Sequence, residues 1–174
     1  EFTGFKDHKT WVKTVSVLVN KHQLKAKFIL VGKGALEEEI RALVKELQLE
    51  DHIIFAGFRK DIPEILPDFD LFMFTSNNEP TGGVLLESYA CKVPIVAANA
   101  GGIPEVVINN QTGLLAEVGN PEDFAEKVIL LLNNPELQEK FKEKGYQYLL
   151  DNFTKEVIAK KMFTELNEVV KSNQ

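Results

Sequence analysis

Two glutamates flank a pair of glycines where an apolar strand pattern gives way to an apolar helical pattern. The junction reads FTSNNEPTGGVLLES, with Glu79 in a polar loop and Glu87 one turn into the following helix. The first main-chain amides of a helix have no intrahelical partner, and the helix dipole is positive there. Glycine also lets a ligand approach the main chain closely. We therefore predict an anion site formed by the N–H groups of Gly82, Gly83 and Val84.

The two carboxylates point to a second part of the same ligand. Carboxylates are poor phosphate ligands, but their oxygens accept hydrogen bonds from hydroxyl groups. Glu87 lies four residues after Gly83 and therefore on the same face of the helix. A nucleotide sugar carries both a diphosphate and hydroxyl-bearing rings. The alternative is that Glu79 is a solvated loop residue and Glu87 an acid favoured by the helix dipole, with no ligand involved.

Other candidate side chains have two interpretations each. Lys6 lies at the entrance of a helical pattern, where its charge opposes the dipole, so it either points to solvent or binds an anion shared with neighbouring amides. Phe58 follows a predicted strand, and it either lies against a flat base or packs under the next helix. The three histidines, His8, His22 and His52, lack metal-ligand spacing and are expected to be structural or exposed.

The elements that position these residues alternate along the chain. Strands are predicted at 27–31, 52–56, 71–74, 94–98 and 114–117, and helices at 10–21, 36–47, 61–66, from Val84 onward, and at 104–107, 121–132, 136–150 and 154–170. This order implies right-handed β-α-β crossovers and an α/β fold with a Rossmann-like parallel sheet that carries helices on both faces.

Ligands of such sheets bind at the carboxyl ends of the strands. The loops at 32–34, 57–59, 75–83 and 99–102 all lie at such ends. The last of them contains Gly101 and Gly102, which either offer further amides or simply form a turn. The first contains G-x-G, but Glu37 stands where the dinucleotide fingerprint needs a third glycine, so NAD binding is disfavoured.

Length and composition are those of a single domain with a continuous core. The chain has 174 residues, is 44% hydrophobic and has a formal charge of -6. The acidic balance argues against general nucleic-acid binding, because phosphate neutralisation needs a basic surface. No apolar run approaches a membrane span and the N-terminus is no signal peptide, so we expect a soluble, cytoplasmic protein. Cys91 is expected to be a buried structural thiol.

The segment Glu79–Glu87, EPTGGVLLE, resembles the E-x7-E motif of the family-4 retaining glycosyltransferases, known as glycosyl transferases group 1, which have the GT-B fold. Five further segments match that family's signatures in the same order, and they are FILVGKG at 28–34, IFAGF at 54–58, PIVA at 94–97, GGIPEV at 101–106 and TGLL at 112–115. The chain thus resembles the C-terminal, nucleotide-sugar-binding half of such an enzyme over nearly its whole length.

The resemblance implies a role for each candidate residue. Glu79, Thr81 and Gly82 would bind the donor sugar, Lys6, Gly82, Gly83 and Val84 the diphosphate, Glu87 the ribose, and Gly57, Phe58 and Arg59 the base. The partner would be a nucleotide diphosphate sugar, either a UDP-sugar or a GDP-sugar. The family is metal-independent, so no cofactor and no metal ligand are expected.

Two positions depart from the family pattern. A basic residue usually stands about five positions before the lysine, where this chain has Glu1, so either that phosphate contact is absent or Glu1 is not the native residue. Thr81 replaces a common bulky residue after the Glu-Pro pair, which leaves the donor sugar open. The first strand of the domain and the N-terminal half also lack counterparts here. In the family that half supplies the acceptor site and a catalytic histidine, so residues 1–174 are interpreted as one fragment that binds a donor without turnover.

The resemblance is also compatible with peripheral association of the full-length enzyme with the inner face of the membrane. The first alternative function is a UDP-sugar 2-epimerase, which uses the same scaffold but fits the E-x7-E pattern less well. The second is a non-catalytic nucleotide-binding or partner-binding domain. A phosphate-responsive signalling module is disfavoured, because Val31 and Phe74 run into glycine, lysine and hydroxyl residues where that module needs acids.

Overall fold

The computed structural model describes residues 1–80 and 82–172. All paired strands are parallel, which confirms the predicted α/β, Rossmann-like class. They form two sheets. One contains β1 (Phe28–Val31) and β2 (Ile53–Gly57), and the other has the order β3 (Phe72–Phe74), β4 (Ile95–Ala98) and β5 (Leu114–Ala116).

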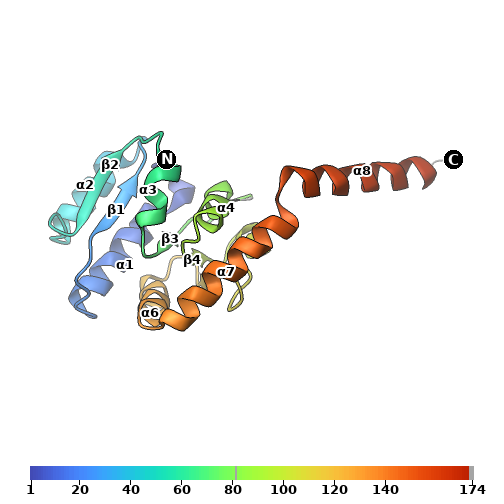
Figure 1. Ribbon diagram of the computed structural model, residues 1–174. Coiled ribbons are helices and arrows are strands. Elements are labelled where there is room, and N and C mark those ends of the chain that lie inside the picture. Colours follow the sequence, from blue (N-terminus) through green and yellow to red (C-terminus); the bar gives the residue numbers. More distant parts are fainter. Residues whose placement is uncertain (81, 173–174) are drawn as a thin grey trace.

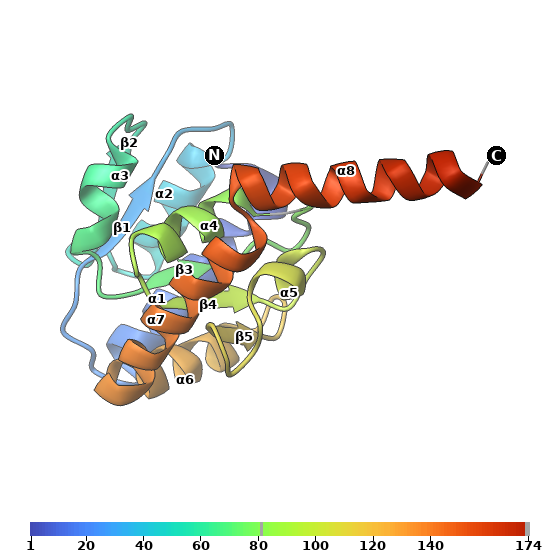
Figure 2. The same cartoon turned by 45° about the vertical axis from the view of Figure 1, so that its right-hand side comes forward.

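Helices cover both faces of these sheets (Figures 1 and 2). They are α1 (His8–Asn20), α2 (Glu37–Glu46), α3 (Ile62–Ile65), α4 (Gly83–Ala90), α5 (Ile103–Val106), α6 (Pro121–Leu132), α7 (Pro135–Asn152) and α8 (Lys155–Ser172), with 3-10 turns at Gly4–Lys6 and Leu66–Asp68. Helix α1 packs on α2 and α6, and α4 packs on α7. Helix α1 begins two residues before its predicted start, because the Asp7 side chain accepts a hydrogen bond from the amide of Thr10 and caps the helix there.

The edge of β1 away from β2 and the edge of β3 away from β4 pair with no other strand within residues 1–80 and 82–172. Residues of both strands line one cavity of about 660 Å³. Leu30, Phe72 and Met73 are among its apolar walls. The main-chain groups of an unpaired edge are the groups that another strand would bond. The unpaired edges of the two sheets therefore border the same cavity, whose walls there are apolar.

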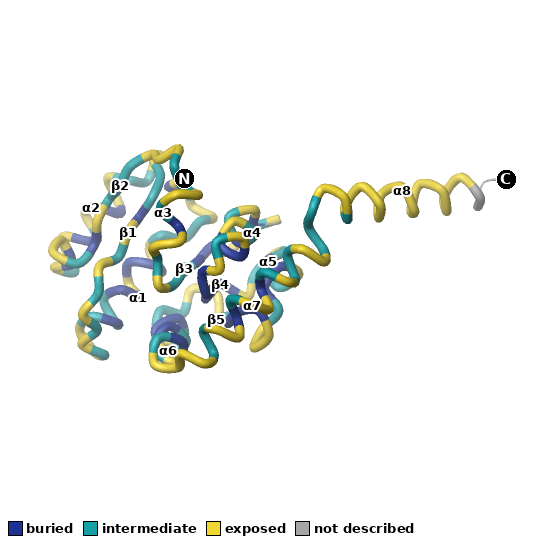
Figure 3. The backbone as a smooth tube through the Cα atoms, in the orientation of Figure 1, coloured by how far each residue is buried: buried dark blue, intermediate teal, exposed yellow. Residues whose placement is uncertain are grey.

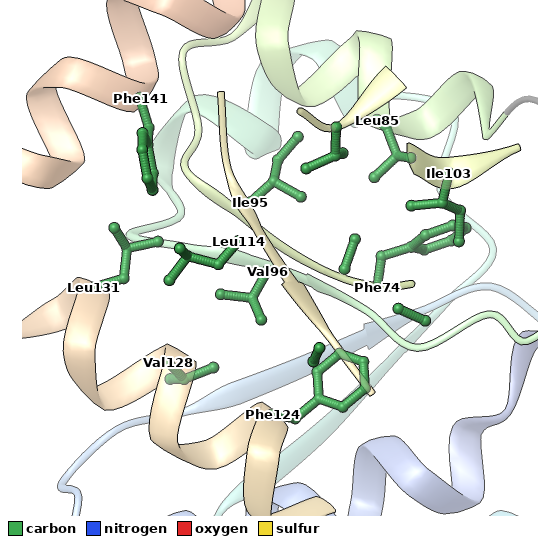
Figure 4. Close-up of a cluster of buried hydrophobic side chains, with 14 of the residues drawn as sticks. Phe74, Leu85, Ile95, Val96, Ile103, Leu114, Phe124, Val128, Leu131 and Phe141 are labelled. Carbon is green, nitrogen blue, oxygen red and sulfur yellow. The ribbon is translucent and has the colours of Figure 1, made fainter. Parts of the chain in front are cut away.

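Each sheet has its own buried cluster. The larger one combines the fully buried strand β4 with apolar side chains of α4 to α7. Figure 4 shows Phe124 and Val128 of α6 below Val96, and Leu131 of α6 to its left. Tyr89 belongs to this cluster. Its hydroxyl lies 2.7 Å from Thr112 Oγ1 and donates a hydrogen bond to the Val106 carbonyl. Burial raises the pKa of this phenol well above its usual range.

Helix α8 leaves the body of the molecule and extends away from it (Figure 1). Its side chains are exposed along almost its whole length, as the tube in Figure 3 shows. Met162, Phe163 and Leu166 are each more than half exposed. The amphipathic pattern over 154–170 therefore formed a helix as predicted, but most of its apolar side chains are exposed. None of the described helices is long and apolar enough to cross a bilayer.

Candidate functional site

The loops that follow β1 to β4 lie at the carboxyl ends of parallel strands, as the sequence pattern required. The N-terminal segment joins them there. The amide of Phe2 donates to the Lys33 carbonyl at 3.2 Å, and the Asn77 amide donates to the Phe5 carbonyl at 2.8 Å. Residues from the start of the chain are thereby held beside the loop after β3. This arrangement brings Lys6 to Glu79.

Lys6 and Glu79 form an ion pair across 73 residues of sequence. Both side chains are mostly buried, with exposed fractions of 23% and 13%. The Lys6 ammonium also lies 5.2 Å from the centre of the Phe74 ring. Of the two interpretations of Lys6, solvent exposure is thus wrong, because the charge lies inside the loop cluster against a carboxylate.

The Glu79 main chain is held from the other side by the loop after β4. The amide of Gly102 donates to the Glu79 carbonyl at 2.8 Å. A Cβ on Gly102 would overlap the carbonyl oxygen of Pro80, and one on Gly101 would crowd Glu79. These two glycines are therefore packing residues of the Glu79 loop, which agrees with the turn interpretation rather than with a second set of ligand amides.

Helix α4 starts at Gly83, with Gly82 in the left-handed region at φ 59°. No side chain within the described residues caps this helix, so the amides at its start face the loop without a protein partner from a side chain. A Cβ on Gly83 would meet only open space. This geometry suits the predicted anion site at Gly82, Gly83 and Val84. Thr81, which was predicted to bind the donor sugar, lies outside the described residues.

The cavity between the sheets connects the remaining candidates. Lys6, Phe58, Arg59, Val84 and Glu87 all line it. One cavity is thus lined by the ammonium of Lys6, the start of α4 at Val84, the carboxylate of Glu87 and the ring of Phe58. Glu79 adjoins this space through its ion pair with Lys6.

Phe58 does not pack under the next helix, since 66% of its surface is exposed. The packing interpretation of this residue is therefore wrong, and its ring is free to contact a ligand. Gly57 precedes it in the left-handed region at φ 66° and turns the chain out of β2. Arg59 forms an ion pair with Asp61, and the hydrogen bond between them raises the pKa of Arg59 and lowers that of Asp61.

The histidines lie apart from any metal-like cluster. Within residues 1–80 and 82–172, no group of three or more His, Cys, Asp or Glu side chains is placed to hold a metal ion. His8 stacks on Phe2 with ring centres 4.4 Å apart. Burial and the positive charge of the N-terminus lower the pKa of His8 from 6.5 to about 4. Cys91 is half-buried, and burial raises the pKa of its thiol, which disfavours the reactive thiolate.

Two residues of the site were missed by sequence reasoning. Thr75 and Ser76 directly follow β3, are 3% and 0% exposed, and donate hydrogen bonds to carbonyls of the N-terminal segment. The available signal was a pair of hydroxyl residues at the carboxyl end of a buried strand. Their partners, however, are 68 to 71 residues away in sequence, a contact that no local pattern reveals.

Residues 2–148 match the family model described as glycosyl transferases group 1. The N-acetyl-alpha-D-glucosaminyl L-malate synthase of Bacillus anthracis is 36% identical over 152 residues, which are 87% of this chain and 40% of that protein. The Glu79–Glu87 segment and the cavity therefore lie within the part of the chain that the family model covers.

Solved structures share the fold. The crystal structure of a TarM mutant from S. aureus in complex with fondaparinux, alpha-GlcNAc-glycerol and UDP has a TM-score of 0.86 and 25% identity, covering 94% of this chain and 33% of that one. The C-terminal domain of a glycosyl transferase group 1 family protein from Francisella tularensis has a TM-score of 0.78 and 24% identity, covering 88% of this chain and 83% of that one. The chain spans 40% or less of the full-length relatives named here.

Proposed function

The chain belongs to the glycosyl transferases group 1 family, and we propose that it is the donor-binding domain of a retaining glycosyltransferase. In this proposal the whole enzyme moves a sugar from a nucleotide diphosphate sugar to an acceptor. One observation carries it: Lys6, Val84 at the start of α4, Glu87 and Phe58 line a single cavity that runs between the sheets and reaches the carboxyl ends of the strands, with Glu79 beside it.

Each part of the donor has a chemically suitable partner. The Lys6 ammonium and the amides of Gly82, Gly83 and Val84 supply positive charge and N–H groups for the diphosphate. Carboxylates accept hydrogen bonds from hydroxyls, so Glu87 would take the ribose and Glu79 the sugar. The exposed ring of Phe58 offers a flat face to the base. We keep Thr81 as a sugar contact by its place in the motif.

The same groups suit the chemistry of sugar transfer. When the bond between the sugar's anomeric carbon and the diphosphate oxygen breaks, negative charge grows on the departing diphosphate. A fixed ammonium and helix-start amides stabilise that charge in a site shielded from water. We therefore propose that transfer needs no metal ion. The assay is sugar transfer by the full-length enzyme in excess EDTA, and loss of activity restored by a divalent cation would contradict it.

We propose UDP as the nucleotide and N-acetylglucosamine as the sugar. The support comes from two relatives: the Bacillus anthracis enzyme is named for N-acetylglucosaminyl transfer, and the TarM complex holds UDP. Titrations that compare UDP-N-acetylglucosamine with UDP-glucose test the sugar.

The remainder of the enzyme would supply the acceptor site and a catalytic histidine. The 40% share of the Bacillus anthracis relative supports this division of the enzyme. The unpaired edges of β1 and β3 further support a missing strand between them, because a parallel strand there would join the two sheets. It would fill the apolar part of the cavity along β1 and β3 and leave the end lined by Lys6, Val84 and Glu87 to the donor.

Calorimetric titration of this chain with UDP, GDP and ADP tests the proposal. We expect heat of binding with UDP, and no hydrolysis or transfer by the domain alone. A ligand that binds only the folded state also raises the melting temperature, which gives a second readout. If none of the three nucleotides at millimolar concentration changes either readout, the proposal is wrong.

A further inference from the structure

The two hydroxyls after β3 converge on three successive carbonyls of the N-terminal segment. Thr75 Oγ1 donates to the carbonyls of Lys6 at 3.2 Å and Asp7 at 3.0 Å. Ser76 Oγ donates to the Phe5 carbonyl at 2.9 Å and lies 3.4 Å from a carboxylate oxygen of Glu79. These contacts bracket Lys6 on both sides.

Both hydroxyls are almost fully withdrawn from water, at 3% and 0% exposure. A buried hydroxyl without a partner is unfavourable, so its hydrogen-bond partners must remain in place. In Thr75 and Ser76 those partners are the main chain of residues 5–7 and, for Ser76, the Glu79 side chain. The hydroxyls thereby tie the segment that carries Lys6 to the end of β3 and to the loop that carries Glu79.

We propose that Thr75 and Ser76 are positioning residues for donor binding, which act by fixing the Lys6 ammonium relative to Glu79. The inference rests on the proposed function, because Lys6 is assigned there to the diphosphate. The Lys6 side chain is long and flexible, so the position of its main chain decides which atoms its ammonium can reach. Residues 1–7 contain only one short 3-10 turn, Gly4–Lys6, so the hydroxyls supply order that local structure lacks.

Ser76 has a second consequence. Its hydroxyl lies between the Phe5 carbonyl and the Glu79 carboxylate, so it links the two halves of the site. Within residues 1–80 and 82–172, the hydrogen bonds of the Thr75 hydroxyl go only to the carbonyls of Lys6 and Asp7. Loss of Thr75 should therefore affect the diphosphate alone, whereas loss of Ser76 should affect both the diphosphate and the sugar.

The test uses Thr75→Val, which keeps the shape and removes the donor, and Thr75→Ser, which restores it. Thr14→Val is the matched control, because Thr14 is also fully buried and donates to a main-chain carbonyl, that of Thr10 at 2.8 Å, within α1. The affinity for UDP is measured by calorimetry in each variant, with Lys6 intact and in a Lys6→Met background. The parent protein is titrated in the same series.

Thr75→Val should weaken UDP binding about tenfold, Thr75→Ser should return it to within about twofold, and Thr14→Val should leave it unchanged. In the Lys6→Met background, Thr75→Val should change UDP affinity less than about twofold, since its effect passes through Lys6. Equal losses in both backgrounds, or an unchanged affinity in Thr75→Val, would overturn the inference while the proposed function stands. Failure of the parent to bind any nucleotide would overturn both.

If Thr75→Val does not fold, Ser76→Ala answers the same question. It should weaken UDP about threefold and UDP-N-acetylglucosamine by clearly more, because its hydroxyl adjoins Glu79. A variant that binds both ligands as the parent does would overturn the role of Ser76.

Discussion

Lys6 and Glu79, 73 residues apart in sequence, form an ion pair. In the proposed complex they bind different parts of the donor, Lys6 the diphosphate and Glu79 the sugar. The pair therefore has to loosen when a donor enters. Desolvation of the two charges offsets much of the attraction within such a mostly buried pair, so a diphosphate with two negative charges can compete for the lysine.

Substitution of Lys6 or of Glu79 should separate binding of the diphosphate from binding of the sugar. Lys6→Met is expected to weaken UDP binding by about ten- to hundredfold, because it removes the charge that faces the diphosphate. Glu79→Gln should leave UDP affinity unchanged or up to about threefold tighter, because it releases Lys6, and should weaken only UDP-N-acetylglucosamine. Calorimetry with both ligands measures this. Equal losses of UDP affinity in the two variants would contradict the division.

Glu87 should act on the ribose alone. In the parent, UDP is expected to bind more tightly than 2′-deoxy-UDP, and Glu87→Gln should erase that difference by weakening UDP about tenfold. Glu105→Gln serves as the control, since Glu105 is an exposed acid in the first turn of α5. Competition titrations give the affinities of the parent and of both variants for the two nucleotides. A persistent preference for the ribonucleotide in Glu87→Gln would show that another group holds the ribose hydroxyl.

Phe58 should matter for binding and not for folding. Because 66% of the residue is exposed, Phe58→Ala is expected to leave the melting temperature within about 2 °C of the parent, while UDP affinity falls about fivefold through loss of contact with the base. Thermal unfolding and calorimetry on one protein preparation measure both quantities. A large fall in melting temperature together with unchanged affinity would restore the packing interpretation.

His8 should make stability depend on pH. Its pKa in the folded protein is about 4, compared with 6.5 for an ordinary histidine, so the unfolded chain binds the proton more readily. Stability is therefore full above pH 6.5 and falls as the pH drops from 6.5 to about 4, by about 1 to 2 kcal/mol after allowance for partial exposure. Urea unfolding of the parent and of His8→Gln between pH 4 and 8 measures this. A pH dependence that is identical in both proteins would rule out His8 as its source.

Gly102 should be intolerant of a side chain. Gly102→Ala would force the Glu79–Pro80 main chain to move, because the new Cβ would overlap the Pro80 carbonyl. We expect a loss of about 1 to 3 kcal/mol in the free energy of unfolding. Relative to the parent, the affinity for UDP-N-acetylglucosamine should fall more than the affinity for UDP. Gly4→Ala is the control, since a Cβ there meets nothing within 4 Å. Unchanged stability in Gly102→Ala would mean that the loop has another conformation available.

Local patterns predicted the elements well, since periodicity and capping are properties of short segments. The helix predicted at 121–132 is α6, and the Asn120 side chain caps it by accepting a hydrogen bond from the Asp123 amide, three residues away. The strand predicted at 94–98 is β4, buried at every position as its apolar run required. Parallel pairing then placed the flagged loops at one edge without any further information.

Contacts between segments that are distant in sequence could not be predicted from local patterns. Phe58 was predicted with two outcomes, and only the fold shows that no helix covers its ring. The pairing of Lys6 with Glu79 depends on hydroxyls of Thr75 and Ser76 that hold the N-terminal segment, and no periodic pattern encodes such bonds. The direction of α8, which extends away from the body of the molecule, likewise does not follow from its own amphipathic pattern.

The central claim is that the start of α4 and the end of β2 bind one nucleotide. An NMR titration of the isotopically labelled chain with UDP tests it most directly, because each main-chain amide reports separately. We predict saturable shifts for Gly82, Gly83, Val84 and Phe58 with a single affinity, and no comparable shift for the amides of α8, which lies away from the cavity. Unchanged amides at α4 and β2 with UDP, GDP and ADP at millimolar concentration would contradict the account.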